Sequence, residues 1–288
     1  MERGLIRTRD FTPEELRKWQ LRLLEILVYF RDFCEEHQLK FWLTGGTLLG
    51  AIRHKGFIPW DDDIDVQMPR DDYERLKMIW NDKADTSKFV CEFPTEERKT
   101  GFPMVMIRSV NTTCIYEHSK YLDICHGLKI DVEYMDGVPS NRIGRLINSF
   151  CAKILAVYRM NRFPVHSSFP IKAVSWILLR CVPSNHLRWK IVRLCENRQR
   201  KFSFDNSEYV RYSICRIQKK INFDKLIYVD FEGFRMPIPS KYDDVLKTSY
   251  DDYMQLPPKD ERYPITDQLT YYNLDKSYVD FKGIYYCV

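Results

Sequence analysis

The chain has 288 residues, of which 44% are hydrophobic, 30% charged and 14% aromatic. These proportions are typical of a folded globular protein and exclude a disordered chain. The net charge of +5 is unevenly distributed, because the segment 142–201 holds thirteen Lys or Arg residues against one acid, a net charge of +12, and the rest carries −7. A basic segment of this kind favours a partner that presents phosphate groups.

The nine cysteines are scattered and form no Cys-x-x-Cys pair, which argues against a disulfide framework or a zinc ribbon. No apolar stretch approaches the roughly 20 residues of a membrane-spanning helix, and the N-terminus lacks the apolar core of a signal peptide. We therefore expect a cytoplasmic protein. The basic segment 142–201 contains interleaved Trp and aliphatic residues, so it is either a set of solvated helix faces or a peripheral contact with the anionic cytoplasmic face of the membrane. Nucleic acid is the less favoured partner.

The first elements along the chain are predicted from helical periodicity and turn residues. Thr12 and Glu15 have the spacing of a capping box around Pro13, and apolar residues then recur at helical spacing, which predicts a long helix that ends near His37. We next expect a strand over 41–43, a turn and helix over 46–54, a strand over 63–68 and a helix over 69–80. The buried face of the first helix should contain Leu16, Trp19, Leu23, Leu27, Phe30 and Phe33.

The later elements suggest an insertion in the middle of the chain. Strands are predicted over 104–108, 112–116 and 128–135, and the basic segment should form two or three helices broken at Pro164, Pro170 and Pro183. A hairpin is expected over 227–231 and 234–238, followed by a helix over 241–253. The order predicts an α+β fold in which a core with a mixed sheet and flanking helices, residues 1–140, carries a basic helical subdomain, residues 141–222. The C-terminal segment, residues 223–288, should pack back on the core.

Four aspartates within five residues form the most informative pattern in the chain. If residues 61–66 are extended, Asp61, Asp63 and Asp65 project to one face, whereas Asp62 projects to the other face together with Ile64 and Val66. Three carboxylates a few ångströms apart repel one another by several kcal/mol unless a cation lies between them. Their hard oxygen ligands favour Mg²⁺, Mn²⁺ or Ca²⁺ over a soft metal.

An EF-hand loop and a solvated turn fit the aspartates less well. An EF-hand loop begins with the same spacing, but its sixth position requires glycine and its twelfth usually holds glutamate, whereas the chain has Val66 and Asp72 there. A solvated acidic turn does not account for the apolar residues that alternate with the acids.

A phosphate-binding pattern precedes the aspartates. Thr44, Gly45, Gly46 and Thr47 lie where a strand passes into a helix, so their backbone N–H groups can bind an anion. Because phosphoryl transfer needs both a phosphate-binding loop and metal ions, the glycines and the acids support each other. The following basic residues, Arg53, His54 and Lys55, could hold a donor diphosphate or could balance the dipole at the helix C-terminus.

These residues resemble the signature of the LicD family, also called the LicD/fukutin phosphotransferases, within the polymerase-β-like nucleotidyltransferase superfamily. The resemblance is dense over residues 42–68, where Gly45-Gly46, Leu48-Leu49-Gly50, Arg53-His54 and Ile58-Pro59-Trp60-Asp61-Asp62-Asp63-Ile64-Asp65 follow one another. It is looser over residues 128–139 and 231–258.

The resemblance implies a nucleotidyltransferase core with two divalent ions, Mg²⁺ or Mn²⁺. Asp63 and Asp65 match the paired metal ligands of the superfamily, and Asp131 matches its third carboxylate and is a candidate base. Asp61 matches a further acidic position. Gly45, Gly46 and Thr47, with Arg53, His54 and Lys55, would bind the donor phosphates.

The activity that the resemblance implies is a phosphotransferase that moves a phospho-alcohol, phosphocholine first among them, from a CDP-activated donor. The acceptor would be a hydroxyl of a cell-surface glycan of the lipopolysaccharide, teichoic acid or capsule type, which could be lipid-linked. Two alternatives stay open: a nucleotidyltransferase that uses another acceptor, and a non-catalytic module that binds metal and membrane.

Overall fold

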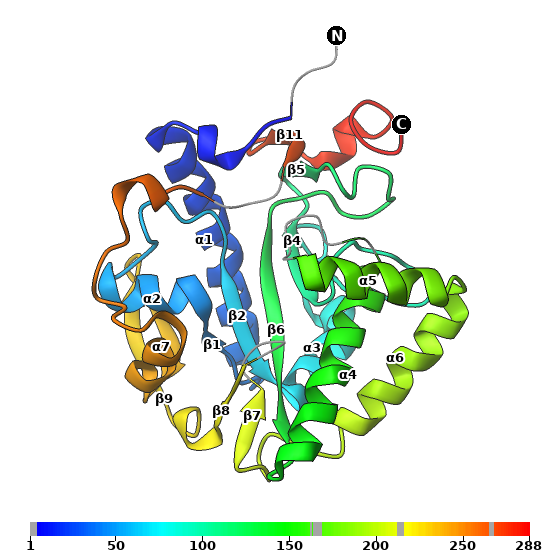
Figure 1. The fold of residues 1–288 in the computed structure, drawn as a ribbon. Coiled ribbons are helices and arrows are strands. Elements are labelled where there is room, and N and C mark those ends of the chain that lie inside the picture. Colours follow the sequence, from blue (N-terminus) through cyan, green and yellow to red (C-terminus); the bar gives the residue numbers. More distant parts are fainter. Residues whose placement is uncertain (1–4, 162, 164–168, 212–215, 265–267) are drawn as a thin grey trace. The chain divides into compact units, whose positions relative to one another are not determined.

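The computed structural model describes residues 5–161, 163, 169–211, 216–264 and 268–288 (Figure 1). The chain forms two compact units. The first contains Met1–Glu92, Met106–Tyr134 and Asn222–Val288, and the second contains Phe93–Val105 and Met135–Ile221. Helices and strands are mixed along the chain, as expected for an α+β protein. The domain boundaries that we expect from the sequence, after residues 140 and 222, stay a prediction.

A central sheet organises the first unit. Its strand order is β1 (Trp42–Leu43), β2 (Asp65–Pro69), β6 (Lys129–Val138), β4 (Val105–Ser109) and β3 (Phe89–Glu92). The pairs β1–β2 and β3–β4 are antiparallel. Strand β6 continues into the second unit, where its last residues pair with β7 (Tyr209–Arg211), which in turn pairs with β8 (Ile217–Lys219). The middle of the sheet therefore places β2 next to β6.

The first helix, α1 (Pro13–Glu36), follows the prediction closely. The Thr12 hydroxyl accepts from the Glu15 N–H, and the Glu15 carboxylate accepts from the Thr12 N–H, so the capping box is formed. The six apolar residues predicted for its inner face are all buried. The other α-helices in the described part of this unit are α2 (Gly45–Arg53), α3 (Arg70–Lys83) and α7 (Tyr242–Tyr250).

Two small sheets complete the first unit. The predicted hairpin is formed by β9 (Leu226–Phe231) and β10 (Phe234–Pro239), with Glu232 and Gly233 both at positive φ in the turn, as a tight hairpin requires. Strand β11 (Leu269–Asn273) pairs with β5 (Thr113–Tyr116). Short 3₁₀ helices lie at Thr8–Asp10, Lys220–Asn222, Lys259–Glu261 and Tyr278–Phe281.

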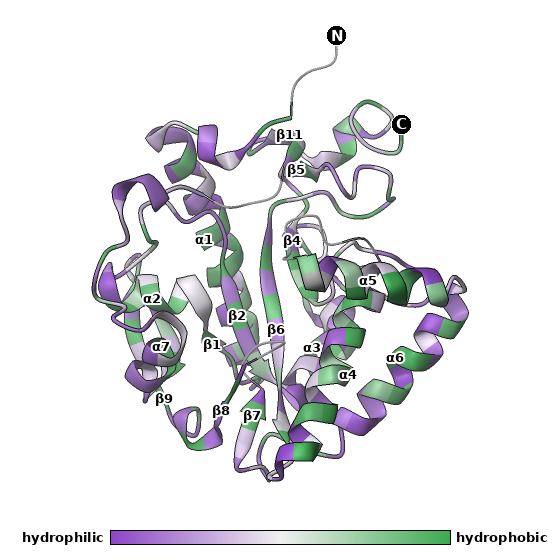
Figure 2. Ribbon diagram, viewed as in Figure 1, coloured by the Kyte–Doolittle hydropathy of each residue, from purple (hydrophilic) through white to green (hydrophobic). Residues whose placement is uncertain are grey.

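Three α-helices lie in the described part of the second unit. They are α4 (Arg142–Met160), α5 (Phe169–Cys181) and α6 (Asn185–Gln199), and Figure 2 shows α5 as hydrophobic over most of its length. Their shared core includes Leu155, Tyr158 and Val192. Among the described residues, no helix combines the length and the hydrophobicity needed to cross a bilayer.

The helix breaks in the basic segment were predicted in part. Pro183 separates α5 from α6 as expected, whereas Pro170 lies inside α5. The prediction of a break at Pro170 was wrong because this proline occupies the first turn, where no intrahelical donor is lost. Pro164 lies outside the described residues.

Some boundaries differ by a few residues. Strand β2 begins at Asp65 and not at residue 63. The hydrogen bonds that join it to β1 and the residue after it start at Asp65, whose carbonyl accepts from the Thr44 N–H at 3.1 Å. Helix α7 ends at Tyr250 and not at residue 253, since Asp251 has a positive φ that stops the helix. Strands β3, β7, β8 and β11 were not predicted.

Candidate active site

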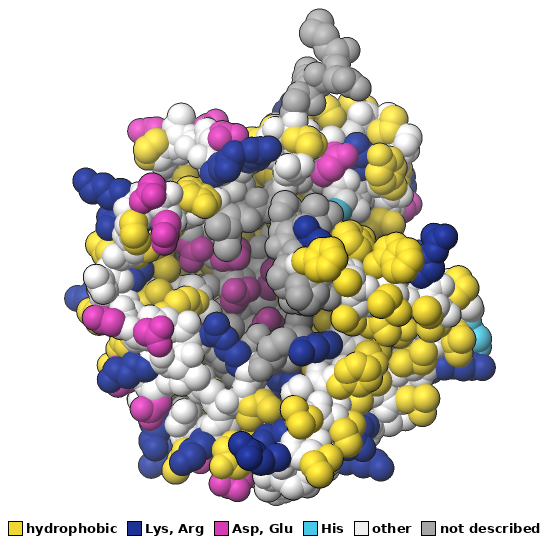
Figure 3. Space-filling model, viewed as in Figure 1, with side chains coloured by type: hydrophobic (Ala, Val, Ile, Leu, Met, Phe, Trp, Pro, Cys, Tyr) yellow, Lys and Arg dark blue, Asp and Glu magenta, His cyan; other side chains and the backbone are white. Residues whose placement is uncertain are grey.

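The aspartates before and within β2 alternate between two environments. Asp61, Asp63 and Asp65 are half-buried, whereas Asp62, Ile64 and Val66 are buried at 2% exposure or less. The predicted alternation is confirmed in the burial of these side chains, although residues 61–64 lie before the strand and not in it. Acidic side chains gather over β2 in Figure 3. The side chains on one face of this segment therefore pack in the core, and the other face carries the carboxylates.

Helix α1 and Thr47 hold the acidic segment in place. The Trp19 indole donates to the Asp62 carbonyl at 2.8 Å, and the Gln20 amide donates to the Asp61 carbonyl at 2.9 Å. The Thr47 hydroxyl accepts from the Asp65 N–H at 2.9 Å. Since these bonds use the backbone of the acidic segment, they fix its path without using the carboxylates.

Strand β6 brings further charged side chains to the same site. The Asp131 N–H donates to the Ile64 carbonyl at 2.9 Å, which sets Asp131 beside the acidic segment. Its Oδ2 accepts from the Lys129 ammonium at 2.5 Å. Glu133 follows two residues later, and its Oε2 accepts from the Gln67 amide at 3.4 Å.

Sequence reasoning missed Lys129 and Glu133. The sequence pattern could have indicated them. Residues 129, 131 and 133 alternate with the buried Ile130 and Val132, in the same way as the aspartates alternate with Ile64 and Val66. The two strands thus contribute an acidic face that is larger than the predicted set.

The crowding of these acids raises their pKa values. Burial and the charges of Asp62 and Asp131 raise the pKa of Asp63 to about 6, although Lys129 opposes the shift. Burial and the Asp131 charge raise the pKa of Glu133 to about 7. Burial and neighbouring carboxylates, Asp63 first among them, raise the pKa of Asp61 and of Asp65 well above the ordinary range. Without a bound cation, these acids therefore keep their protons to a higher pH than solvent-exposed carboxylic acids do.

The glycine pair lies directly against the acids. A methyl group added at Gly45, whose φ is +56°, would come within 3.2 Å of the Asp65 Oδ2. One added at Gly46 would come within 3.0 Å of the Asp61 Oδ2. These residues begin α2, and the Thr44 side chain makes no capping bond to the first turn. The N-terminus of α2 therefore lies directly beside these carboxylates.

The predicted basic residues lie at the other end of α2. From Gly45 to Arg53 the helix rises about 12 Å. Arg53 donates to the Tyr253 carbonyl at 2.8 Å, and the His54 ring lies 6.3 Å from the Trp60 ring. Burial, and then the Arg53 charge, lowers the pKa of His54, and Lys55 is exposed. Donor binding by Arg53, His54 and Lys55 stays a prediction.

The carboxylate oxygens of the acidic face are ligands that suit a hard divalent ion. The Asp131 Oδ1 is buried and has no hydrogen-bond partner among the described residues. In the part of the chain that the structure describes, however, no three acidic, histidine or cysteine side chains are arranged as a finished metal-binding set. Mg²⁺ commonly takes one or two carboxylates together with substrate phosphates, so carboxylates beside a helix N-terminus fit an ion that arrives with a phosphorylated substrate.

The C-terminal hairpin supports the loop that follows α2. The Glu232 Oε1 accepts from the Phe57 N–H at 3.0 Å, and its Oε2 accepts from Arg17 at 2.6 Å. A methyl group at Gly56 would lie 2.3 Å from the Glu232 Oε1, so only glycine leaves room for this carboxylate. The second loose stretch of the resemblance, around residues 231–233, thus has a structural role next to the site.

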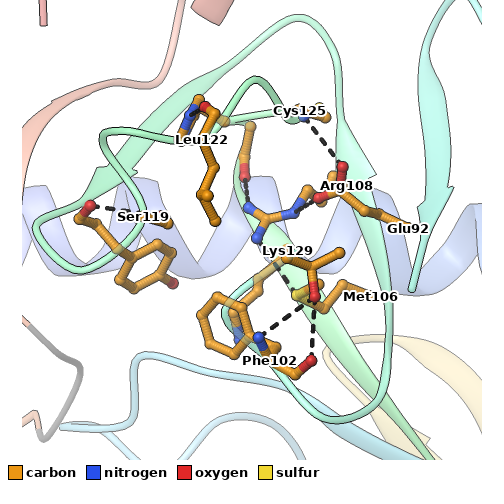
Figure 4. A network of polar contacts seen from close by, with 12 residues as sticks. Glu92, Phe102, Met106, Arg108, Ser119, Leu122, Cys125 and Lys129 are labelled. Atoms are coloured by element: carbon orange, nitrogen blue, oxygen red, sulfur yellow. Dashed lines mark hydrogen bonds and ion pairs between the residues drawn. The ribbon is translucent and has the colours of Figure 1, made fainter. Parts of the chain in front are cut away.

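A second charged cluster in the same unit is built around a buried ion pair. The Arg108 Nε lies 2.9 Å from the Glu92 Oε2, with both side chains at 0% exposure. Arg108 also donates to the Gly127 carbonyl at 3.0 Å, and the other Glu92 oxygen accepts from the Cys125 N–H at 3.2 Å (Figure 4). This cluster ties β3 and β4 to the chain before β6.

Comparison with known proteins assigns this arrangement to a class. Residues 38–117, which contain the glycine pair and the aspartates at 61–65, match the family model described as LicD/FKTN/FKRP, nucleotidyltransferase domain. The chain is 30% identical over 267 residues to the lipopolysaccharide cholinephosphotransferase LicD of Haemophilus influenzae, covering 86% of this chain and 95% of that protein. The chain therefore belongs to the LicD family.

Two eukaryotic relatives match shorter stretches. Human ribitol 5-phosphate transferase FKRP is 42% identical over 78 residues, which cover 26% of this chain and 16% of that protein. Mannosyltransferase regulator 4 of Saccharomyces cerevisiae is 32% identical over 127 residues, which cover 43% of this chain and 10% of that protein.

Proposed function

We propose that this protein transfers a substituted phosphate group, phosphocholine in the first instance, from a CDP-activated alcohol to a hydroxyl of a cell-surface glycan. The observation that carries the proposal is the position of the Asp61 and Asp65 carboxylates against Gly46 and Gly45 at the N-terminus of α2. A helix N-terminus binds phosphate, and carboxylates beside it can bind the cation that accompanies a diphosphate. Similarity to the Haemophilus LicD over most of both chains supports phosphocholine and a lipopolysaccharide-type glycan.

The reaction exchanges one phosphorus–oxygen bond for another. The acceptor hydroxyl oxygen bonds to the phosphorus that carries the alcohol, and the bond from that phosphorus to the bridging oxygen breaks. CMP leaves with the bonding electrons, and the hydroxyl proton passes to a carboxylate. We assign this base to Asp131, whose Oδ1 has no hydrogen-bond partner among the described residues.

A divalent ion, Mg²⁺ or Mn²⁺, would be held by Asp63, Asp65 and Asp131, with Asp61 as a further ligand. When bound, it would neutralise donor oxygens and lower the pKa of the acceptor hydroxyl. The chain's own contribution is positioning, because Trp19, Gln20 and Thr47 fix the backbone that carries the acids. Lys129 keeps part of the acidic face neutralised.

The test is CMP release from CDP-choline in the presence of Mg²⁺ or Mn²⁺ and a lipopolysaccharide-type glycan. We expect release that depends on metal and acceptor, and that falls by about three orders of magnitude in Asp63→Asn. Asp71→Asn is the matched control, since Asp71 is an exposed acid in the first turn of α3. Equal activity in the wild type and in Asp63→Asn would refute the proposed site.

Ribitol phosphate is the second candidate for the transferred group. The observation in its favour is the 42% identity to FKRP. Parallel assays with CDP-choline and CDP-ribitol decide between them, because the correct donor should give the higher kcat/KM at the same acceptor concentration.

A further inference from the structure

Helix α4 has two apolar stripes, of which the outer one is exposed in the part of the unit that the structure describes. Its inner stripe, which includes Cys151, Leu155 and Tyr158, is buried in the core of the second unit. Its outer stripe begins at Ile143 and continues with the residues three, four and seven positions after Ile143. The members of this outer stripe are exposed: Ile143 at 72%, Leu146 at 71%, Ile147 at 42% and Phe150 at 57%. A solvent-facing helix surface is normally polar, so this stripe indicates a binding surface.

Helix α5 adds a second group of exposed apolar side chains. Leu178 and Leu179 pack on the core of the unit, whereas Phe169, Val174, Trp176 and Ile177 are exposed, Phe169 at 81%. The space-filling view shows hydrophobic side chains gathered on this face over α4 and α5 (Figure 3). We call the exposed residues of α4 and α5 named here the apolar face.

Basic groups border the apolar face. Arg142 and Lys153 are exposed at the two ends of the α4 stripe. On α5, the Arg180 guanidinium lies 5.7 Å from the centre of the Trp176 ring, so the cation and the amphipathic indole are side by side. In the whole segment 142–201 the one acid is Glu196, and it forms an ion pair with Arg159. No acidic side chain of α4 or α5 therefore opposes a negatively charged partner.

We propose that the apolar face docks on the surface of an anionic phospholipid bilayer. Apolar side chains with Trp among them and a cationic border are the features of helices that lie in the interface plane of a membrane. A second copy of the chain is disfavoured as the occupant, because it would bring a segment of net charge +12 against an identical one. Helix α5 has 13 residues, and no described helix is both long and apolar enough to span a bilayer, so α4 and α5 would lie on the surface.

The experiment is flotation of the full-length protein with vesicles of phosphatidylcholine alone and of phosphatidylcholine with about 30% phosphatidylglycerol. We expect binding to the anionic vesicles that is at least about tenfold stronger than to the neutral ones and that weakens as salt is raised. Equal binding to both vesicles, or binding to neither, overturns the proposal.

Substitutions in the apolar face test whether its side chains contact the vesicles. Leu146→Asp with Phe150→Asp, and separately Trp176→Asp, should each lower the affinity for anionic vesicles by about tenfold or more. Met78→Asp changes an equally exposed residue of α3, at 70% exposure, and should leave vesicle binding unchanged. Because all these side chains are exposed, the thermal unfolding midpoint should stay the same, which excludes misfolding as a cause.

Size-exclusion chromatography in the absence of vesicles tests a second copy of the chain as the occupant. The proposal expects the wild type and Leu146→Asp to elute as the same species. A wild-type dimer that Leu146→Asp converts into a monomer would overturn the proposal and assign the apolar face to a second copy of the chain.

Discussion

Two clusters of charged residues in the first unit use carboxylates in opposite ways. Glu92 is fully buried, with one oxygen 2.9 Å from the Arg108 Nε and the other accepting from the Cys125 N–H. The acidic face of β2 and β6 instead places Asp63, Asp65 and Asp131 together, and Lys129 offsets only part of their repulsion, since the pKa values of Asp63 and Asp65 remain raised.

The difference separates acids that stabilise the fold from acids that, in the proposed function, bind a metal ion and its substrate. Removing one member of a paired buried cluster leaves a buried charge without compensation. Removing one member of a crowded cluster of like charge relieves repulsion. Stability and activity should therefore respond in opposite directions at the two clusters.

The largest expected effect is on activity at the acidic face. Asp65→Asn should lower kcat of CMP release by about three orders of magnitude, because it removes a charge that would hold the metal and the donor in the proposed site. The free energy of unfolding of the metal-free protein should stay equal or rise, since a half-buried carboxylate with a raised pKa is lost. Steady-state kinetics and urea unfolding of the same preparation measure both quantities. A variant that lost stability as well as activity would contradict the distinction.

The paired cluster should show the reverse. Glu92→Ala should lower the free energy of unfolding by about 3–5 kcal/mol, because Arg108 remains buried without its partner. Urea unfolding at pH 7 is the measurement. The double variant Glu92→Ala with Arg108→Met should recover part of the loss, since it removes the unpaired charge. A double variant less stable than Glu92→Ala would mean that the charge of Arg108 is compensated elsewhere.

The next largest effect is the pH dependence of stability that the acidic face should cause. In the metal-free protein the folded-state pKa is about 6 for Asp63 and about 7 for Glu133, against ordinary values of 3.8 and 4.5. Between pH 4 and 7 the folded state binds more protons than the unfolded state, so stability is present below pH 4 and is lost as the pH rises through the folded-state pKa values. We expect a loss on the order of 2 kcal/mol from these groups.

Thermal unfolding across pH 4.5–8, with and without Mg²⁺, measures this loss. The ion should restore stability at pH 8 and have little effect at pH 4.5, where protons compete for the same oxygens. Asp63→Asn should flatten the profile. A metal-free protein whose unfolding midpoint rises steadily from pH 4.5 to 8 would contradict the raised pKa values.

The sequence predicted the parts of these clusters that depend on local pattern. Alternation of acids with Ile64 and Val66 placed the carboxylates on one face, and the glycine pair marked the start of a helix. Helical spacing placed the buried face of α1, including Trp19, although not its bond to the Asp62 carbonyl. These features depend on neighbours a few residues apart, which a single sequence displays.

The rest depended on contacts between distant residues. Glu92 and Arg108 lie on short strands, one of which was not predicted, and nothing local indicates that they pair. Lys129 and Glu133 join the acidic face because β6 lies beside β2, an adjacency that sequence spacing does not provide. The outer stripe of α4 could be read as part of an amphipathic helix, but which of its two apolar stripes is buried was decided by packing.

The smallest expected effect concerns the space between α2 and the acids. Gly46→Ala places a methyl group 3.0 Å from the Asp61 Oδ2 and should raise KM for the donor by about tenfold, because the carboxylate must shift within a crowded site. Gly233→Ala is the matched control, since its φ of +81° strains the backbone but no atom lies within 4 Å of the added methyl group. It should cost about 1 kcal/mol of stability and leave KM unchanged. If both variants changed KM equally, the close approach of α2 to Asp61 would have no part in donor binding, and the effect would come from lost stability alone.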